Sequence, residues 1–170
     1  MVFFRASITA ELMTTRAFQI IITCFIAMFL AQILKVIIYS IRHKRFMGRM
    51  FFTTGGLPSS HSALCVCLCI ILGMLQYHDE NQLTWAFAVS VVLASVVLYD
   101  AMGIRLEASK HAKILNKLAE DMTEEEKNEL YGKKGQLKEM LGHRGIEVLC
   151  GALLGAAVGF AGFGIVMMIG

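Results

Sequence analysis

The chain has 170 residues, enough for one domain, and 56% of them are hydrophobic while only 17% are charged. Soluble domains carry about a quarter of their residues as charged side chains, so this composition indicates a membrane protein. It excludes a disordered chain, a coiled coil and a disulfide-stapled secreted module. The formal net charge of +3 is too small to indicate a nucleic-acid-binding protein, and no nucleic-acid partner is expected.

Four apolar runs predict membrane-spanning helices, each of which needs about 20 residues. The second run is shorter, and it spans the bilayer only if 58–62 enters the membrane with it; a re-entrant or buried segment is the alternative. Residues 1–16 mix polar and apolar side chains and predict an interfacial helix, and no signal-peptide cleavage is expected. A single proline in the chain favours long helices. The four runs are 17–41, 63–77, 85–104 and 146–170.

The predicted fold is therefore a single all-α membrane domain, 1–170. It is a bundle of about four transmembrane helices with an N-terminal interfacial helix and a cytoplasmic helical loop at 105–142. Lys and Arg fill the links after the first and third runs, whereas the link 78–84 has neither. Because such residues favour the cytoplasm, both basic links are predicted to be cytoplasmic and both ends to lie on the far side. A multi-pass protein of the cell (plasma) membrane is expected.

Within the long loop, 106–118 is expected to extend the third helix as an amphipathic segment. Thr123 followed by Glu126 forms a capping box, which predicts a short helix over 124–131. Gly132 and Gly135 indicate a turn. A solvated surface is the favoured interpretation of this loop, and a basic face on anionic lipid is the alternative.

Small residues within the apolar runs predict close packing between helices. The five cysteines all lie in these runs and are interpreted as free thiols acting as small hydrophobes. A stripe of Gly151, Gly155 and Gly159 recurs every four residues, which permits close approach of another helix. The partner helix could belong to this chain or to a second copy, so a homo-oligomer is possible.

Polar residues gather at the predicted cytoplasmic ends of all four runs, and such residues in membrane spans are functional candidates. Each pattern has a plain structural alternative: a snorkelling lysine, a simple turn or a capped helix. The case for a site rests on their conjunction on one face. The residues are Lys35 and Arg42 on the first run, Ser59, Ser60 and His61 before the second, Asp100 and Arg105 after the third, and His143, Arg144 and Glu147 before the fourth.

The spacing of these residues suits a phosphate. Lys35 and Arg42 are two helical turns apart, so both cations share a face. The loop 55–61 ends where a helix begins, and a helix N-terminus favours anions. His143 and Glu147 are four positions apart and so share a helical face, and a carboxylate beside an imidazole fixes its tautomer and makes the other ring nitrogen a better nucleophile.

Three stretches resemble the divergent type 2 phosphatidic acid phosphatase family, which is related to acid phosphatases and vanadium-dependent haloperoxidases. They are Gly-Gly-Leu-Pro-Ser-Ser-His-Ser-Ala at 55–63, Tyr-Asp-Ala-Met-Gly-Ile-Arg at 99–105 and Leu-Gly-His-Arg-Gly-Ile-Glu-Val at 141–148. The resemblance covers roughly 18–165. The wider superfamily has three motifs. The first is Lys, six residues, Arg and Pro, and the second is Pro-Ser-Gly-His. The third is Ser-Arg, five residues, His, three residues and Asp.

This chain departs from those motifs at several positions. His43 replaces the Pro of the first motif, and Ser60 replaces the Gly of the second. In the third, Glu147 replaces Asp, and Gln136 and Leu137 stand where Ser-Arg would be. One phosphate-gripping arginine is therefore missing, and Arg105 or Arg144 is a candidate substitute.

The resemblance implies hydrolysis of a lipid or isoprenoid phosphate monoester without a metal or other cofactor. His143 would attack phosphorus and form a phosphohistidine, Glu147 would orient it, and His61 would protonate the leaving alcohol. The cations and the hydroxyls and amides of 59–61 would hold the phosphoryl oxygens. The departures leave two alternatives: a lipid-phosphate binding or translocating protein without hydrolysis, and a non-catalytic membrane subunit.

Overall fold

The computed structural model describes residues 2–53, 55–131, 137 and 145–169, and every regular element in these ranges is a helix. Four segments are long and apolar enough to cross a membrane: Thr15–His43, Ser60–Glu80, Trp85–Asp121 and Gly145–Met168. The predicted all-α membrane bundle is thereby confirmed. The elements are α1 (Val2–His43), the 3-10 helix η1 (Gly48–Phe52), α2 (Ser60–Glu80), α3 (Trp85–Met102), α4 (Ile104–Leu118), the 3-10 helix η2 (Ala119–Asp121), α5 (Glu124–Tyr131) and α6 (Gly145–Ile169).

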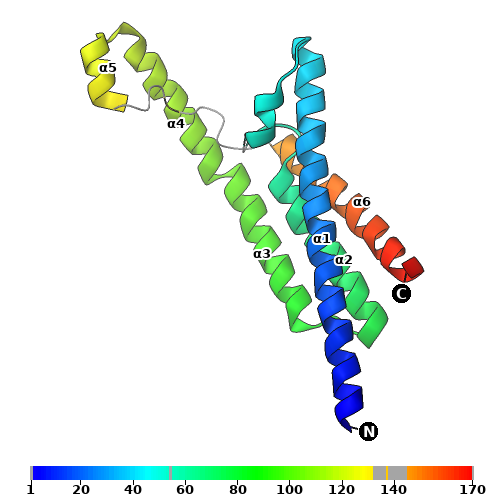
Figure 1. Ribbon diagram of the computed structural model, residues 1–170. Helices are drawn as coiled ribbons and strands as arrows, with labels where there is room; N and C mark the ends of the chain where they lie inside the picture. Colours follow the sequence, from blue (N-terminus) through cyan, green and yellow to red (C-terminus); the bar gives the residue numbers. More distant parts are fainter. Residues whose placement is uncertain (1, 54, 132–136, 138–144, 170) are drawn as a thin grey trace.

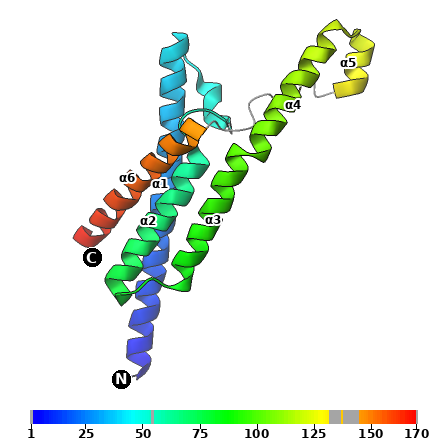
Figure 2. The same ribbon diagram turned by 180° about the vertical axis from the view of Figure 1, so that it is seen from behind.

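Helix α2 is the centre of the bundle, since it packs against α1, α3 and α6 (Figures 1 and 2). Helix α3 continues across Gly103 into α4, and α4 and α5 form an arm that projects beyond the bundle (Figure 1). Both chain ends lie at the end of the bundle away from η1. The first turn of α2, which is one of the segments expected to carry the site, is therefore at the opposite end from the termini.

The short second run proves to be part of a full-length helix. Helix α2 has 21 residues and begins directly after Ser59, whose side chain accepts a hydrogen bond from the Ser62 N–H. It ends at Asn81, which adopts the left-handed conformation with φ of 55° and so closes the last turn. The residues preceding the apolar run thus supply the cap and first turn, which lengthens the helix to a membrane-spanning one.

The N-terminal segment differs in one respect from the expected arrangement. Residues 2–16 are helical, but they continue directly into the first transmembrane segment, and α1 runs for 42 residues without a break. Neither proline nor glycine occurs between residues 2 and 43, so no residue in this stretch interrupts the backbone hydrogen bonds of the helix.

The core consists of small side chains at the crossing of α1, α2 and α6. Alanine and cysteine let helix backbones approach closely, which is how membrane helices gain packing energy. All five cysteines are free thiols, three of them buried and two half-buried. The buried core residues are Cys24, Ala27, Ala31, Ala63, Cys67, Ile71, Leu75 and Val166.

The glycine stripe of α6 packs against α2 of the same chain. A Cβ at Gly151 would meet the carbonyl oxygen of Ser59, and one at Gly155 would meet that of Ala63. At Gly159 the neighbour is the side chain of Ile70, 2.9 Å from the added atom. The stripe therefore joins α6 to α2, and association of two copies through it stays a prediction.

The capping box predicted in the long loop is present. The Thr123 N–H and hydroxyl donate to Glu126 Oε2 at 2.7 and 2.9 Å, and the Glu126 N–H donates to Thr123 Oγ1 at 3.4 Å. The bonds from Thr123 hold the pKa of Glu126 below its usual value. Helix α5 has the predicted bounds, 124–131, and the turn expected at 132–135 lies outside the described residues.

Candidate functional site

Lys35 is the fixed cation at the η1 end of the bundle. Lys35 is 0% exposed, although it lies on a membrane-spanning helix. The ammonium Nζ donates to the carbonyl oxygen of Thr53 at 3.1 Å and is attracted by the carboxylate of Glu147. Burying an ammonium is costly unless it is hydrogen-bonded or paired with a charge, and the Thr53 carbonyl supplies the hydrogen bond here. This lysine therefore does not snorkel into solvent.

The loop before α2 closes over Lys35. Gly56 has φ of +102°, a conformation that side-chain-bearing residues rarely adopt. A Cβ there would lie 3.1 Å from the Tyr39 hydroxyl oxygen and 3.4 Å from Lys35 Cδ. The Gly-Gly pair is thus more than a flexible turn, because Gly56 lets the loop backbone pass close to α1.

Glu147 attaches the first turn of α6 to this loop. Its Oε2 accepts a hydrogen bond from the Gly56 N–H at 3.3 Å, and its main-chain oxygen accepts one from the Ser59 N–H at 3.0 Å. Four residues further on, Gly151 faces the Ser59 carbonyl. The segments that carry Lys35, Ser59 and Glu147, expected from three separate motifs, are brought together at one end of the bundle.

Ser59 and Ser60 are both buried at the start of α2, at 0% and 2% exposure. Ser59 Oγ accepts from the Ser62 N–H at 3.3 Å and from the Ser62 hydroxyl at 2.9 Å. Its hydroxyl therefore serves as a helix cap. His61 is exposed in the first turn of α2, as a proton donor to an external substrate must be.

Of the remaining candidates, the structure describes the side chains of Arg42 and Asp100. Arg42 is exposed in the last turn of α1, beyond the level of Lys35. Asp100 is half-buried near the end of α3. Arg105 lies in α4, and its side chain is outside the described set, as are residues His143 and Arg144. Helix α6 begins at Gly145, so the predicted helical pairing of His143 with Glu147 is not tested.

Leu137 stands at the position of the missing motif arginine, and its backbone is bonded to the arm. Leu137 exchanges two hydrogen bonds with the side chain of Asn116 in α4, at 2.9 and 3.0 Å. Asn116 is itself buried. The start of the third motif is thus held against α4.

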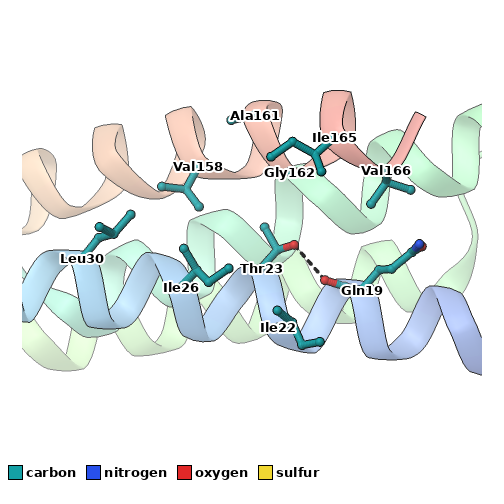
Figure 3. Close-up of a pocket in the computed structure, with 10 residues that line it drawn as sticks. All are labelled: Gln19, Ile22, Thr23, Ile26, Leu30, Val158, Ala161, Gly162, Ile165 and Val166. Carbon is teal, nitrogen blue, oxygen red and sulfur yellow. Dashed lines mark hydrogen bonds between the residues drawn. The ribbon is translucent and has the colours of Figure 1, made fainter. Parts of the chain in front are cut away.

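A pocket of about 350 Å³ lies elsewhere in the membrane region, between α1 and α6 (Figure 3). Its polar features are Gln19 and Thr23, and the Thr23 hydroxyl donates to the Gln19 carbonyl at 2.7 Å. With an almost entirely apolar lining it does not suit a phosphate. The lining residues are Gln19, Ile22, Thr23, Ile26, Leu30, Val158, Ala161, Gly162, Ile165 and Val166.

Sequence reasoning missed the hydrogen-bond partners of Lys35 and Glu147 because they are backbone groups. The Thr53 carbonyl and the Gly56 N–H hold Lys35 and Glu147, and no side-chain pattern indicates a main-chain partner. The sequence feature that could have indicated these backbone contacts is the Gly55-Gly56 pair. The resulting centre combines a buried cation and a helix start, both of which favour an anion, with a carboxylate that holds the loop backbone at Gly56.

Comparison with known proteins places the chain in a family. The sequence matches the Divergent PAP2 family over residues 17–158. A relative, the uncharacterized membrane protein YuiD of Bacillus subtilis (strain 168), is 34% identical over 139 residues, which are 76% of this chain and 84% of that protein. No solved structure matches the chain. The match spans the segments that carry Lys35, Ser59 and Glu147, and this chain therefore belongs to the Divergent PAP2 family.

Proposed function

We propose that this protein is a membrane phosphatase that hydrolyses a lipid or isoprenoid phosphate monoester without a metal. The observation that carries the proposal is the contact of three motif segments around Lys35, Gly56 and Glu147. Family membership supports a phosphatase-like protein. The contact supports a phosphate site, because a preorganised cation beside a helix start is suited to hold phosphoryl oxygens.

The proposed reaction has two steps. A ring nitrogen of His143 attacks phosphorus while the bond to the alcohol oxygen breaks, and His61 gives its proton to that oxygen. Water then attacks phosphorus as the bond to the His143 nitrogen breaks, and His61 takes a proton from that water, which releases inorganic phosphate and restores both imidazoles. Lys35 and Arg42 offset the charge of the phosphoryl oxygens. Lys35 has three N–H donors, of which the Thr53 carbonyl takes one.

The position of the centre indicates the substrate class. Lys35 lies in a segment long enough to span the bilayer, and the loop that covers it joins two such segments. An alcohol with a long hydrocarbon tail can keep that tail in the bilayer while its phosphate reaches this end. The excess of Lys and Arg in the links at this end supports a cytoplasmic site in the cell membrane.

Release of inorganic phosphate by purified protein tests the proposal. Protein in lipid nanodiscs should release phosphate from a short-chain phosphatidic acid, and vanadate should inhibit the reaction. His143→Ala should abolish release, because the nucleophile is lost. Phosphate release by His143→Ala at the wild-type rate would overturn the assigned nucleophile.

A non-hydrolytic lipid-phosphate binder is the second candidate. The observation that favours it is Leu137, which stands at the place of the motif arginine and is bonded to Asn116 of the arm. Under this alternative, wild-type protein binds the lipid phosphate but releases no phosphate between about pH 5 and 8. That range covers the titration of an ordinary histidine, so the outcome would not depend on a poorly chosen pH.

A further inference from the structure

The end of α1 and the chain that follows it carry several cations and no acidic residue of their own. We define the basic hairpin as residues 36–53, the last two turns of α1 together with the chain that returns through η1 (Figure 1). Neither Asp nor Glu occurs between residues 12 and 78 of the sequence. The hairpin's four Lys and Arg side chains are all exposed: Arg42, Lys44, Arg45 and Arg49.

The hairpin has a defined structure. Lys44 adopts φ of 52°, which reverses the chain after α1. The Ser40 carbonyl accepts from the Arg45 N–H at 3.2 Å, and its hydroxyl accepts from the Met47 N–H at 3.0 Å. Met50 is buried at 5% exposure. These contacts fix the returning chain against α1, so the cations are presented from a defined surface.

Large apolar side chains accompany the cations. Phe46 and Phe52 are 85% and 87% exposed, and Ile41 is 73% exposed. Full exposure of three such side chains to water is unfavourable, which indicates that an apolar phase covers them. Aromatic residues with Lys and Arg nearby are typical of the membrane–water boundary.

A row of rings connects the hairpin to the bilayer-facing side of α1. Phe25 and Phe29 have centroids 6.5 Å apart, and Phe29 stacks on Phe51 at 6.5 Å. Phe51 then meets Phe52 edge-on at 5.3 Å. Phe25 and Phe29 are exposed on a membrane-spanning segment, so the row passes from the bilayer interior to its surface.

The end of α1 reaches beyond the start of α2. Arg16 of α1 pairs with Asp79 at the far end of α2, at 3.1 Å, and Lys35 binds Thr53 shortly before α2 begins. Eight residues of α1 follow Lys35, a length of about 12 Å at 1.5 Å per residue. The hairpin therefore occupies the layer next to the hydrocarbon, where lipid headgroups lie.

We propose that the basic hairpin binds the headgroups of anionic phospholipids. Its cations complement the charge of anionic headgroups. Its aromatic row continues into the hydrocarbon, which an acidic protein or a nucleic acid would not contact. The hairpin includes Thr53, the partner of Lys35, so the bound lipids lie beside the candidate site. The inference does not require hydrolysis, and a catalytically inactive protein should bind the same lipids.

Spin-labelled lipids measure this preference directly. Protein in phosphatidylcholine vesicles is given spin-labelled phosphatidylglycerol or phosphatidylcholine, and the motionally restricted fraction is compared. The wild type should prefer the anionic label by at least about threefold, and added salt should weaken the preference. The variant Lys44→Gln/Arg45→Gln/Arg49→Gln should lose most of it. Arg42 is kept because it belongs to the candidate site.

A matched control separates the hairpin from overall charge. Lys110→Gln/Lys113→Gln/Lys117→Gln removes three exposed cations from α4 and should leave the preference unchanged. An equal loss in both triple variants, or no preference in the wild type, would overturn the proposal. Neither result bears on phosphate release, so failure here is distinguishable from failure of the proposed phosphatase.

A single-residue probe covers the case in which the triple variant does not fold. Phe52→Trp in a Trp85→Phe background places one tryptophan on the hairpin. Brominated lipids with bromine near the headgroup should quench its fluorescence more strongly than those with bromine at the chain end. Quenching by aqueous iodide alone would show the hairpin in water and contradict the proposal.

Discussion

The packing of α6 on α2 predicts opposite effects of one substitution at two glycines. A Cβ at Gly151 would lie 3.1 Å from the carbonyl carbon of Ser59 and 3.0 Å from Ser62 Cβ, and closer still to the Ser59 carbonyl oxygen. At Gly164, in the same helix, an added Cβ meets no atom within 4 Å. Gly151→Ala should therefore destabilise the protein, while Gly164→Ala should stabilise it slightly.

The size of the effect follows from two contributions. Alanine is favoured over glycine within a helix by up to about 1 kcal/mol, and this gain applies to both variants. Overpacking against backbone atoms costs about 1–3 kcal/mol and applies to Gly151 alone. The difference between the variants isolates the steric cost. For a chain of this length it corresponds to about 2–12 °C in Tm, at about 2–4 °C per kcal/mol.

A thiol-reactive fluorescent dye provides the assay, because the buried cysteines become accessible only when the helices separate. Cys24, Cys65 and Cys67 are buried in α1 and α2. Melting curves of Gly151→Ala, Gly164→Ala and the wild type in the same detergent give the two shifts. If Gly151→Ala raised Tm as much as Gly164→Ala, the described packing of α6 on α2 would be wrong.

Two further substitutions test individual contacts. Lys35→Met should lower Tm by about 2–12 °C, since it leaves the Thr53 carbonyl without this donor, at a cost of about 1–3 kcal/mol. In a Glu147→Gln background the cost should be smaller, and equal costs would show that the two residues are not coupled. Thr123→Ala should speed amide exchange in 124–131 a few-fold by removing the helix cap, as measured by hydrogen–deuterium exchange. Because the pKa of Glu126 is lowered in the folded state, the stabilisation that Glu126 gives to α5 is present at neutral pH and is lost as pH falls through that lowered pKa. If the protection of 124–131 against exchange were unchanged in acid, after correction for intrinsic rates, this reasoning would be contradicted.

The fold was largely predictable because the bilayer imposes a simple length and polarity rule. That rule located all four spanning segments, and the capping box located α5. It did not locate the start of α2, because Ser59 and Ser60 are polar residues buried by tertiary contacts with α6. It also gave no sign that residues 2–16 would continue α1, since polar side chains do not end a helix.

The candidate site was predictable only in part. Sequence reasoning placed Lys35 and Glu147 at the same end of the bundle, and both bind the loop before α2, at Thr53 and Gly56. Glu147 also binds the Gly56 N–H and so holds α6 to the loop before α2, while its expected role beside His143 stays a prediction. Spacing along one helix could not indicate this contact, which joins segments 91 residues apart.

The backbone contacts explain how this end of the bundle can differ from the superfamily motifs and keep its arrangement. Thr53 and Gly56 contribute main-chain atoms to Lys35 and Glu147, and a main-chain atom does not depend on the side chain beside it. Ser60 in place of glycine is therefore compatible with the fold. The arrangement depends on the side chains of Lys35 and Glu147 and on Gly56, where the positive φ and the close contact with Tyr39 disfavour a Cβ. Loss of activity in variants of these residues must accordingly be compared with their stability before it is assigned to chemistry.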